Sequence, residues 1–578
     1  MTTDPSRQAL LLPAVLLAVA LPTLLAWNVS PSPTFLNQAL AMGGWAAFVL
    51  LLSGSQPSQP GLAASRAAAP LQAALALLAL AALASGTLGG LPDSLMLSAL
   101  GQLGVAALVV HAGAAARAAD DGDAVFVAFA WAWLVTGLAN LGLGLVQVFA
   151  PSWPDGDWVA LSNIVGRAVG NLRQPNHLSS VLLWAAIAAA ALLELRRLPR
   201  AVGMAAFAAL IFGVVLTASR TGLVSVGILA LWGLLDRRLS GPVRLLLLAA
   251  PLIYALGWLG MAQWAEIGRH TFGGAARLAE TDVSGSRFGI WANTLALIRA
   301  HPWTGVGWGE FNLAWTLTPF PGRPTAFFDH THNLPLQLAV ELGLPLATGV
   351  LALLLWALAR VARRAWQAAG EAAVTRRAAL MFVLMIGLHS LLEYPLWYAY
   401  FLLPTAWAFG FGLGNAAPAR RTAGLRLLFP AAALTVALVS YAIWDYTRVT
   451  TIFVAADDAP PLAQRIERGQ QSLFFAHHAD YAAATTEVGE RLRARAFDSA
   501  THFLLDTRLM MAWAEELARR GDLDRARHLA DRLREFRNPA SKDWLAACDR
   551  QPPGDPARPF QCEPPQRIYG WQDFLPRR

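Results

Sequence analysis

The stretch Asp329–Asn333, which reads Asp-His-Thr-His-Asn, stands directly before an apolar run that begins at Leu334. The chain passes there from a long polar loop into a hydrophobic helix, so this boundary marks the start of a membrane span. At the membrane surface, imidazole and carboxylate groups can exchange protons with a molecule that approaches from the bilayer. The alternative is a polar cap on a membrane helix, and the rest of the chain decides between the two.

The composition is that of a membrane protein. The chain has 578 residues, of which 56% are hydrophobic and 14% are charged, whereas soluble domains carry about 25% charged residues. The 22 tryptophans suit a protein with many helix ends at the membrane interface. The formal net charge is +8, but the arginines lie mostly in short loops between apolar runs. That pattern is typical of membrane topology, and without a basic stripe interleaved with aromatic residues we expect no nucleic acid partner.

Thirteen apolar runs are candidates for membrane-spanning helices, each of which needs roughly 20 residues. We therefore expect an all-α polytopic membrane protein with about 13 transmembrane helices. The first run has no small-residue cleavage site and is expected to remain as a span rather than to be removed as a signal peptide. The runs are Leu10–Trp27, Leu36–Leu52, Pro70–Leu88, Leu95–Ala115, Ala124–Phe149, Leu178–Leu195, Ala201–Thr217, Leu223–Leu235, Leu245–Met261, Leu334–Leu358, Ala378–Leu392, Tyr400–Leu413 and Leu427–Trp444.

Arginine-rich loops predict the orientation of these spans. Counting spans places four such loops on the same side as the N-terminus, and the excess of arginine indicates that this side is cytoplasmic. The outer side then holds the loops 151–174 and 262–333, the turn at Glu393-Tyr394 and everything after Trp444. The four cytoplasmic loops contain Arg196–Arg200, Arg237–Arg244, Arg360–Arg377 and Arg420-Arg421.

The sequence predicts two domains. Residues 1–445 form a transmembrane domain with a large outer loop at 262–333, and residues 446–578 form an outer domain of helical hairpins. In the second domain, Met511–Arg519 and Asp522–Phe536 are two amphipathic helices joined by a tight turn. Cys548 and Cys562 fall in this outer, oxidising compartment, so we expect a disulfide that closes a short proline-rich loop. The other ligands of a zinc site are missing, so we expect no metal there.

Five polar stretches on the outer side contain groups that are rare beside hydrocarbon. Arg220 separates two apolar runs, and an arginine in that position is costly unless it is paired or lines a polar cavity. Glu393 is its candidate counter-ion, so a purely structural pair is an alternative, as is a capping role for Arg173. The five stretches are Gly170–His177, Thr217–Gly222, Arg287–Phe311, Asp329–Asn333 and His389–Tyr398.

The chemistry of these stretches indicates an anionic lipid headgroup. Guanidinium groups match the geometry of phosphate and stay charged, so outer-face arginines predict the binding of a group such as a diphosphate. Histidine is then the natural general base for a hydroxyl acceptor. The Gly305-x-Gly307-x-Gly309 run has no strand before it and no lysine after it, so it predicts a tight turn rather than a phosphate loop.

The stretch around His332 resembles the O-antigen ligase superfamily. His332-Asn333, followed after nine residues by Gly343-Leu344-Pro345, is similar to the ligase signature of His-Asn, a spacer and Gly-x-x-Gly. The signature is incomplete, because Leu346 stands where the second glycine is usual. The run from Arg287 to Gly307 is similar to the loop that precedes this signature.

Two further stretches resemble the bacterial protein O-oligosaccharyltransferases, the branch that glycosylates pilins and other periplasmic proteins. Arg173–His177 reads Arg-Gln-Pro-Asn-His, and Glu393–Tyr398 reads Glu-Tyr-Pro-Leu-Trp-Tyr, and both are similar to motifs of that branch. The additional C-terminal domain also fits it. The resemblance implies a multi-pass protein of the bacterial inner membrane, with a cytoplasmic N-terminus and a periplasmic C-terminal domain.

The resemblance implies transfer of a preassembled glycan from undecaprenyl-diphosphate, a membrane lipid, to a hydroxyl of a periplasmic or pilin protein, with no cofactor and no required metal. His332 is the predicted general base and His330 its rival, with Asn333 beside them as a further catalytic candidate. Transfer inverts the anomeric carbon, and arginines hold the diphosphate. The predicted substrate-binding residues are Arg173, Gln174, Asn176, His177, Arg220, Arg287, Glu393, Tyr394 and Tyr398.

Three other functions are alternatives. An O-antigen ligase would transfer the glycan to lipid A-core, and an O-antigen polymerase would transfer it to a second lipid-linked glycan. A transporter of lipid-linked glycans is the non-enzymatic alternative. Transporters often contain internal repeats and charges near the bilayer midplane, whereas the polar residues here gather at one face and no repeat is evident.

Overall fold

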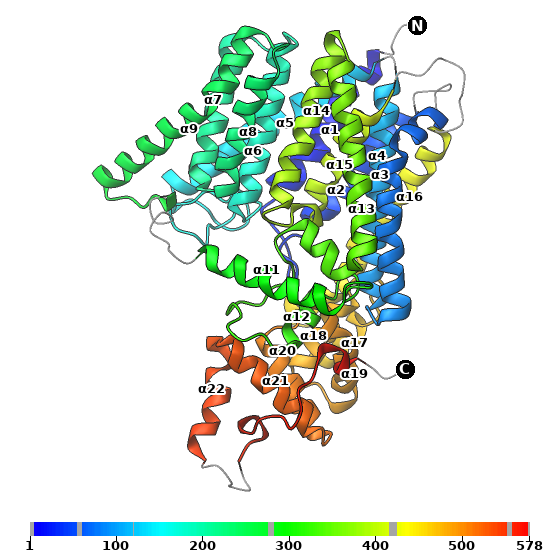
Figure 1. Cartoon of the computed structure of the whole chain (residues 1–578), viewed down its shortest axis with the longest axis vertical. Coiled ribbons are helices and arrows are strands. Elements are labelled where there is room, and N and C mark those ends of the chain that lie inside the picture. The colour runs from blue at the N-terminus through cyan, green and yellow to red at the C-terminus, as the bar shows by residue number, and fades with distance from the viewer. Residues whose placement is uncertain are drawn as a thin grey trace. The chain divides into compact units, whose positions relative to one another are not determined.

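The computed structural model describes residues 5–54, 61–119, 121–274, 283–415, 425–551 and 558–575. These residues form helices joined by loops, with no strand among them (Figure 1). Within the described ranges, ten helices are long and apolar enough to cross a membrane, and three shorter apolar helices accompany them. The predicted all-α polytopic membrane fold is confirmed. Each of the thirteen predicted runs lies on one of these helices, while the number that crosses the membrane stays a prediction.

The chain divides into two compact units. The first comprises Met1–Leu75, Gly104–Thr281 and Ala352–Tyr441, and the second comprises Ala76–Leu103, Asp282–Leu351 and Ala442–Arg578. One boundary between these units, after Tyr441, lies near the predicted domain boundary at residue 445, and residues 76–103 and 282–351 group with the C-terminal helices. The two predicted domains stay a prediction. Four helices have residues in both units: α3 (Gly61–Ala84), α4 (Asp93–Ala118), α13 (Leu334–Gln367) and α16 (Leu425–Phe453).

Helix α6 (Pro175–Glu194) forms the centre of the first unit, and its residues from Pro175 to Leu193 are all buried. Small residues allow its neighbours to approach closely, as is usual between membrane helices. A Cβ added to Gly137 would lie 2.1 Å from Cβ of Ala185, so only glycine fits there. The helices that pack against α6 are α5 (Gly122–Phe149), α7 (Arg200–Thr217), α8 (Arg220–Leu235), α9 (Gly241–Gly268) and α14 (Gly370–Ser390).

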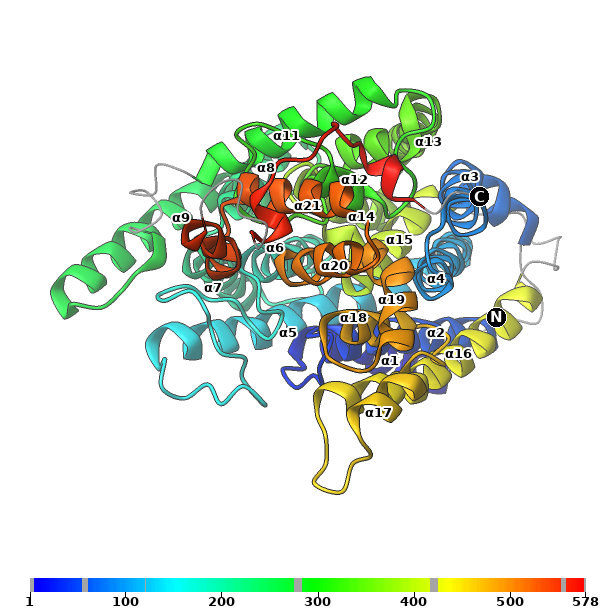
Figure 2. The same ribbon diagram turned by 90° about the horizontal axis from the view of Figure 1, so that it is seen from below.

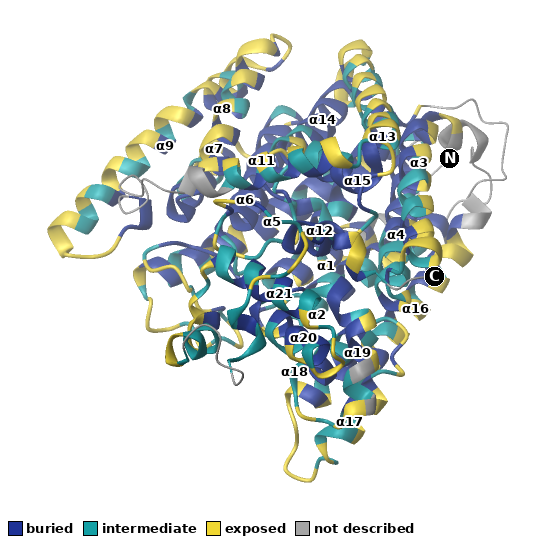
Figure 3. Ribbon diagram, turned by 60° about the horizontal axis from the view of Figure 1, so that its bottom comes forward, coloured by how far each residue is buried: buried dark blue, intermediate teal, exposed yellow. Residues whose placement is uncertain are grey.

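Aromatic side chains join α6 to the other helices of this unit. The ring centroids of Trp133 and Trp184 are 4.6 Å apart, and Trp184 Nε1 donates to the carbonyl oxygen of Phe382 over 3.0 Å. Trp407 on α15 (Ala399–Leu413) packs against Phe129, with centroids 4.3 Å apart. By contrast, α9 exposes a row of leucines, as expected of a lipid-facing helix (Figure 3). Helices α1 (Pro5–Leu24) and α2 (Phe35–Gly54) pack against each other, and each of them contacts α15. Helix α1 also packs against α5.

The second unit contains two helices inside the predicted outer loop, α11 (Val283–Ala300) and α12 (Phe311–Leu317). It also contains a series of short C-terminal helices, and Figure 2 shows α18 to α21 as neighbours. Their bounds are α17 (Leu462–Gly469), α18 (Ala476–Thr485), α19 (Glu490–Phe503), α20 (Thr507–Arg519), α21 (Leu523–Phe536) and α22 (Lys542–Leu545).

The predicted helical hairpin is present as α20 and α21, with Gly521 in the left-handed region at the turn. Helix α20 begins earlier than predicted, at Thr507, because the Asp506 carboxylate caps it by accepting from Leu509 N over 2.9 Å. Two additional packed pairs, α17 with α18 and α18 with α19, precede it. The sequence did not reveal these pairs, and α16 also extends to Phe453, beyond the predicted end of the last span.

The C-terminal helices pack against the segment that contains α12. Nε2 of His528 on α21 lies 2.8 Å from the carbonyl oxygen of Leu317 and donates to it. Arg323 is buried between the rings of Trp315 and Phe536, and its guanidinium lies 3.2 Å from the Glu535 carboxylate. Cys548 and Cys562 are joined by a disulfide with their Cα atoms 5.2 Å apart. Of the arginines that predicted the topology, Arg420 and Arg421 lie outside the described residues.

We predict that the C-terminal helices lose stability as the pH falls from 6.5 toward 4. Burial lowers the pKa of His528 from 6.5 to about 4. The unfolded chain therefore binds a proton in this window that the folded chain excludes, which amounts to roughly 3 kcal/mol at most. His528→Gln retains a donor for Leu317 but does not titrate, so hydrogen exchange of α20 and α21 should depend less on pH. Equal pH dependence in both proteins would contradict the prediction.

Candidate functional site

The loop that carries His332 is held by hydrogen bonds on both sides. Thr331 is fully buried, its carbonyl oxygen accepts from Nε1 of Trp291 on α11 over 2.9 Å, and its N–H donates to Oε1 of Gln337 over 2.7 Å. The other end of the Gln337 amide donates to Oε1 of Glu341 over 2.9 Å. Gln337 and Glu341 are themselves buried on α13. The backbone beside His332 is therefore pre-positioned by two helices.

His332 adopts a left-handed backbone conformation, with φ of 56°. Residues other than glycine seldom adopt this conformation, and where they do it is often at a functional site. The half-buried ring of His332 points its edge at Phe328, with ring centroids 5.6 Å apart. The Asn333 side chain caps α13, because its Oδ1 accepts from Leu336 N over 3.0 Å. The backbone thus turns sharply at His332 and enters the helix immediately afterwards.

His330, the rival base, pairs with its neighbour in the chain. Its Nδ1 lies 3.0 Å from Oδ1 of Asp329, whose side chain is largely exposed. A carboxylate in this position selects the tautomer and orientation of the ring. This contact favours a supporting role for His330, and the choice of base between His330 and His332 stays a prediction.

The glycine-rich run before α12 forms a turn, as predicted, and docks on a kink in α13. Val306 N donates to the carbonyl oxygen of Val340 over 2.8 Å, Gly307 N donates to that of Glu341 over 3.0 Å, and Leu344 N donates to that of Pro302 over 2.7 Å. The kink is at Gly343, with φ of 74° and ψ of 162°. A Cβ there would lie 2.3 Å from the carbonyl oxygen of Trp303. Only glycine fits this backbone conformation and this contact.

We predict that Gly343→Ala destabilises the protein by at least about 1–3 kcal/mol, because an L-residue is strained in this conformation and the new methyl group clashes with the loop. Thermal unfolding of the purified chain in detergent measures the loss. Gly349→Ala is the matched control, since a Cβ at Gly349 meets nothing within 4 Å on the same helix. Equal stability of the two variants would count against the account of the kink.

In the first unit, the start of α6 gathers several of the predicted binding residues. The Gln174 side chain caps the helix by accepting from His177 N over 2.9 Å. Asn176 is buried, and its Nδ2 donates to Oε1 of Glu393 over 3.1 Å while its Oδ1 accepts from Ser219 Oγ over 2.6 Å. These bonds join α6 to the connection before α8 and to the turn after α14. They favour a positioning role for Asn176.

His177 lies among tyrosines from the turn that leads into α15. Its Nδ1 is 3.3 Å from the Tyr400 hydroxyl, and its ring centroid is 4.7 Å from that of Tyr398. Tyr394 in turn stacks on Tyr398, with centroids 6.1 Å apart. The structure thus brings six predicted residues together with Tyr400 in one unit. Gln174, Asn176 and His177 come from the start of α6, and Glu393, Tyr394 and Tyr398 come from the turn after α14.

The three predicted diphosphate-binding arginines lie on different elements. Arg173 precedes α6 in a left-handed conformation, and its guanidinium donates to the carbonyl oxygens of Ala26 and Pro33. Arg220 is exposed at the first position of α8. Arg287 is half-buried on α11 in the second unit. Their shared role toward a diphosphate and the pairing of Arg220 with Glu393 stay predictions.

Sequence reasoning missed several residues that organise these groups. Gln337 and Glu341 lie inside the predicted apolar run Leu334–Leu358. Ser219 lies in the polar stretch Thr217–Gly222, and the sequence gives no separate role for it. Ser180 was also overlooked; its Oγ lies 2.8 Å from Nδ1 of His389. A polar residue within an otherwise apolar helix was the available signal, because such groups are rare in membranes unless they have a partner or a function.

Three family models match parts of the chain that contain these groups. One described as O-antigen ligase matches residues 205–351, and one described as protein glycosylation ligase matches residues 168–193. A third, described as the C-terminal part of a virulence factor membrane-bound polymerase, matches residues 377–546. Together the matches include both the His332 loop and the group around His177.

Two relatives from Acinetobacter baylyi (strain ATCC 33305 / BD413 / ADP1) are similar to the chain. A general O-oligosaccharyltransferase is 27% identical over 252 residues, which cover 42% of this chain and 43% of the relative. A ComP-specific O-oligosaccharyltransferase is 27% identical over 264 residues, which cover 43% of this chain and 44% of the relative. Each alignment thus spans less than half the length of the relative.

The fold is that of a polytopic membrane protein, and its residues 205–351 match the O-antigen ligase family. Both relatives carry the name O-oligosaccharyltransferase, which supports the branch that the motifs around Arg173 and Glu393 indicate. The resemblance found in the sequence is therefore confirmed.

Proposed function

We propose that this protein transfers a preassembled glycan from undecaprenyl-diphosphate to serine or threonine hydroxyls of periplasmic or pilin proteins. The observation that carries the proposal is the His332 loop. His332 has a left-handed backbone, and α11 and α13 hold the preceding residue, Thr331, by hydrogen bonds. A histidine in this setting, within the stretch that matches the O-antigen ligase family, is suited to act as a positioned base. The matches to protein glycosylation enzymes support protein as the acceptor.

The proposed reaction is a single displacement. His332 accepts the proton of the acceptor hydroxyl, whose oxygen attacks the anomeric carbon of the first sugar. The bond between that carbon and the diphosphate oxygen breaks, and the lipid diphosphate leaves with the bonding electron pair. Attack from the face opposite the leaving group inverts the anomeric carbon. No nucleotide sugar takes part, because the lipid diphosphate is the activated donor.

The arginines stabilise the charge that develops on the leaving diphosphate. Arg173, Arg220 and Arg287 are assigned this role, since guanidinium groups bind phosphate oxygens in pairs and remain charged. Gln174 and Asn333 cap helices, so they act by holding the backbone next to the reacting groups. Tyr394 and Tyr398 present stacked rings and hydroxyls for contact with the sugar. Asn176, His177 and Glu393 form the buried support beneath them.

The location follows from the same reasoning. We place the chain in the inner membrane with its N-terminus in the cytoplasm and its C-terminal helices in the periplasm. The arginine-rich loops, which the span count places on the side of the N-terminus and opposite the C-terminal helices, support this orientation. The disulfide between Cys548 and Cys562 suits an oxidising compartment.

We expect His332→Ala to reduce transfer by about 10²- to 10⁴-fold, the usual contribution of a general base. Transfer is measured with the purified chain, an undecaprenyl-diphosphate glycan and a pilin-type acceptor protein. His330→Ala in the same assay ranks the rival base, and unchanged thermal unfolding shows that each variant is folded. Wild-type transfer by His332→Ala would refute the mechanism.

O-antigen ligation and polymerisation remain as second candidates, because two family models carry those descriptions. Mass spectrometry of cells with and without this chain separates the three. Glycan on periplasmic proteins supports the proposal, glycan on lipid A-core supports a ligase, and longer lipid-linked glycans support a polymerase.

A further inference from the structure

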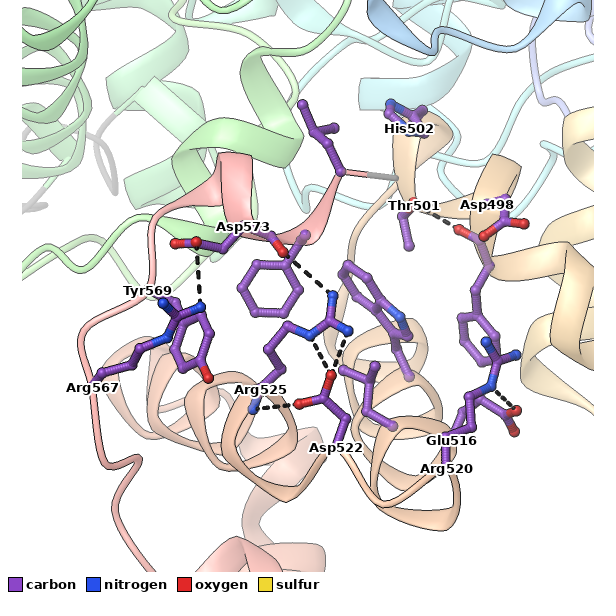
Figure 4. A pocket seen from close by; sticks show the side chains of 15 residues that line it. Asp498, Thr501, His502, Glu516, Arg520, Asp522, Arg525, Arg567, Tyr569 and Asp573 are labelled. Atoms are coloured by element: carbon purple, nitrogen blue, oxygen red, sulfur yellow. Dashed lines mark hydrogen bonds and ion pairs between the residues drawn. The ribbon is translucent and has the colours of Figure 1, made fainter. Parts of the chain in front are cut away.

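A cleft with a volume of about 440 Å³ lies among the C-terminal helices. Its walls come from α19, α20, the start of α21 and the segment 567–575 (Figure 4). Its volume is within the range of about 300–1,000 Å³ that is usual for ligand sites. Trp513, Leu517 and Phe574 are buried in its wall. The surface that the cleft offers to a ligand is mostly polar, with these apolar side chains behind it.

Three arginines around the cleft each have a carboxylate partner. Arg520 Nε lies 2.7 Å from Oε1 of Glu516, Arg567 lies 3.5 Å from Asp573, and Arg525 pairs with Asp522. Figure 4 shows Arg567 and Asp573 on one side, Glu516 and Arg520 on the other, and Arg525 and Asp522 between them. Asp498 adds a fourth carboxylate to the lining, so the cleft has no excess of cations and does not suit a diphosphate. It suits a ligand that presents both hydrogen-bond donors and acceptors.

The chain itself shows how these helices hold a polypeptide. The Asp524 carboxylate on α21 accepts from Gln566 N over 2.5 Å and from the Tyr569 hydroxyl over 2.9 Å. Arg525 donates to the carbonyl oxygen of Asp573 over 3.3 Å, and the Phe574 ring packs against Trp513. Side chains of α20 and α21 thus bind backbone groups and an aromatic anchor of a segment that is neither α-helix nor strand. An acceptor polypeptide offers the same groups.

The cleft is also joined to the His332 loop within the same unit. His502, which lines the cleft, has its Nδ1 2.8 Å from both carboxylate oxygens of Glu310, and both side chains are buried. Two residues further on, Asn312 donates to the carbonyl oxygen of Phe328 over 2.9 Å and accepts from Leu505 N over 2.8 Å. The Asn312 side chain therefore joins the segment that leads into the His332 loop to the connection between α19 and α20.

We propose that this cleft docks a loop segment of the acceptor protein. The proposal rests on the proposed function, since it identifies where the acceptor of that reaction is held. The precedent of the segment 566–575 favours polypeptide over glycan as the occupant. Docking there raises the local concentration of acceptor hydroxyls at the His332 loop without changing the chemical step.

The test uses the full chain with two charge reversals, Arg520→Glu and Arg567→Glu, on side chains that are 48% and 58% exposed. Glu516 keeps a partner in the variant, because Arg519 also pairs with it. Arg537→Glu is the matched control, since Arg537 is an exposed arginine outside the cleft lining. Replacing both cleft arginines by lysine retains their charge. Thermal unfolding verifies that every variant is folded.

Binding of a labelled pilin-type acceptor protein is measured by fluorescence anisotropy with the cleft changes placed in the His332→Ala chain, which needs no turnover. The charge-reversed cleft should bind the acceptor about tenfold more weakly or worse, whereas the Arg537 control and the double lysine variant should bind within about twofold of the parent. In active chains, the cleft variant should show a raised KM for the acceptor with unchanged kcat and unchanged KM for the lipid donor.

Three results would overturn the docking proposal: equal affinity with and without the cleft reversals, no binding of the acceptor by the His332→Ala chain, or displacement of the acceptor by the free glycan, which would make the cleft a sugar site. Failure of the proposed function looks different. In that case the wild-type chain forms no glycosylated product even though the acceptor binds in a manner that depends on the cleft.

Discussion

The close approach of two backbone segments at Gly343 is the contact on which the second unit's part of the candidate site depends. Because Gly343 has no Cβ, the carbonyl of Trp303 reaches the kink in α13, and backbone hydrogen bonds link the glycine-rich turn to Val340 and Glu341. The side chain of Glu341 then accepts from Gln337, which in turn accepts from the backbone of Thr331. The backbone contact that requires glycine at position 343 is thus linked, by hydrogen bonds along one turn of α13, to Thr331, which precedes His332.

Each of the two units contains one of the two groups of residues assigned to the proposed glycan transfer. The second unit contains the His332 loop, and its C-terminal helices are connected to that loop through Glu310 and Asn312. The first unit contains the group of tyrosines around His177, supported by Asn176 and its buried bonds. Four helices run through both units, so neither group is an independent module. The family matches include residues of both units.

Apolar runs predicted the membrane helices well, because a span of hydrocarbon imposes length and composition on each helix separately. Ends and small helices were predicted less well. The cap at Asp506 lengthened α20, and α18 and α19 carry too few periodic apolar residues to stand out. The motif at His332 predicted the residue but not its left-handed backbone, nor the bonds from Trp291 and Gln337 that hold the preceding Thr331. The contact of Asn176 with Glu393 joins residues 217 positions apart, and no local pattern encodes it.

In the proposed reaction, His332 activates the acceptor hydroxyl directly, so that the sugar passes from diphosphate to acceptor in one step. The anomeric configuration of the product tests this most directly. With a lipid donor of known configuration, nuclear magnetic resonance of the glycosylated acceptor determines the configuration of the new bond. The account predicts inversion. Retention of configuration would require either a covalent sugar–enzyme intermediate or attack from the same face as the leaving group, and would contradict a single displacement.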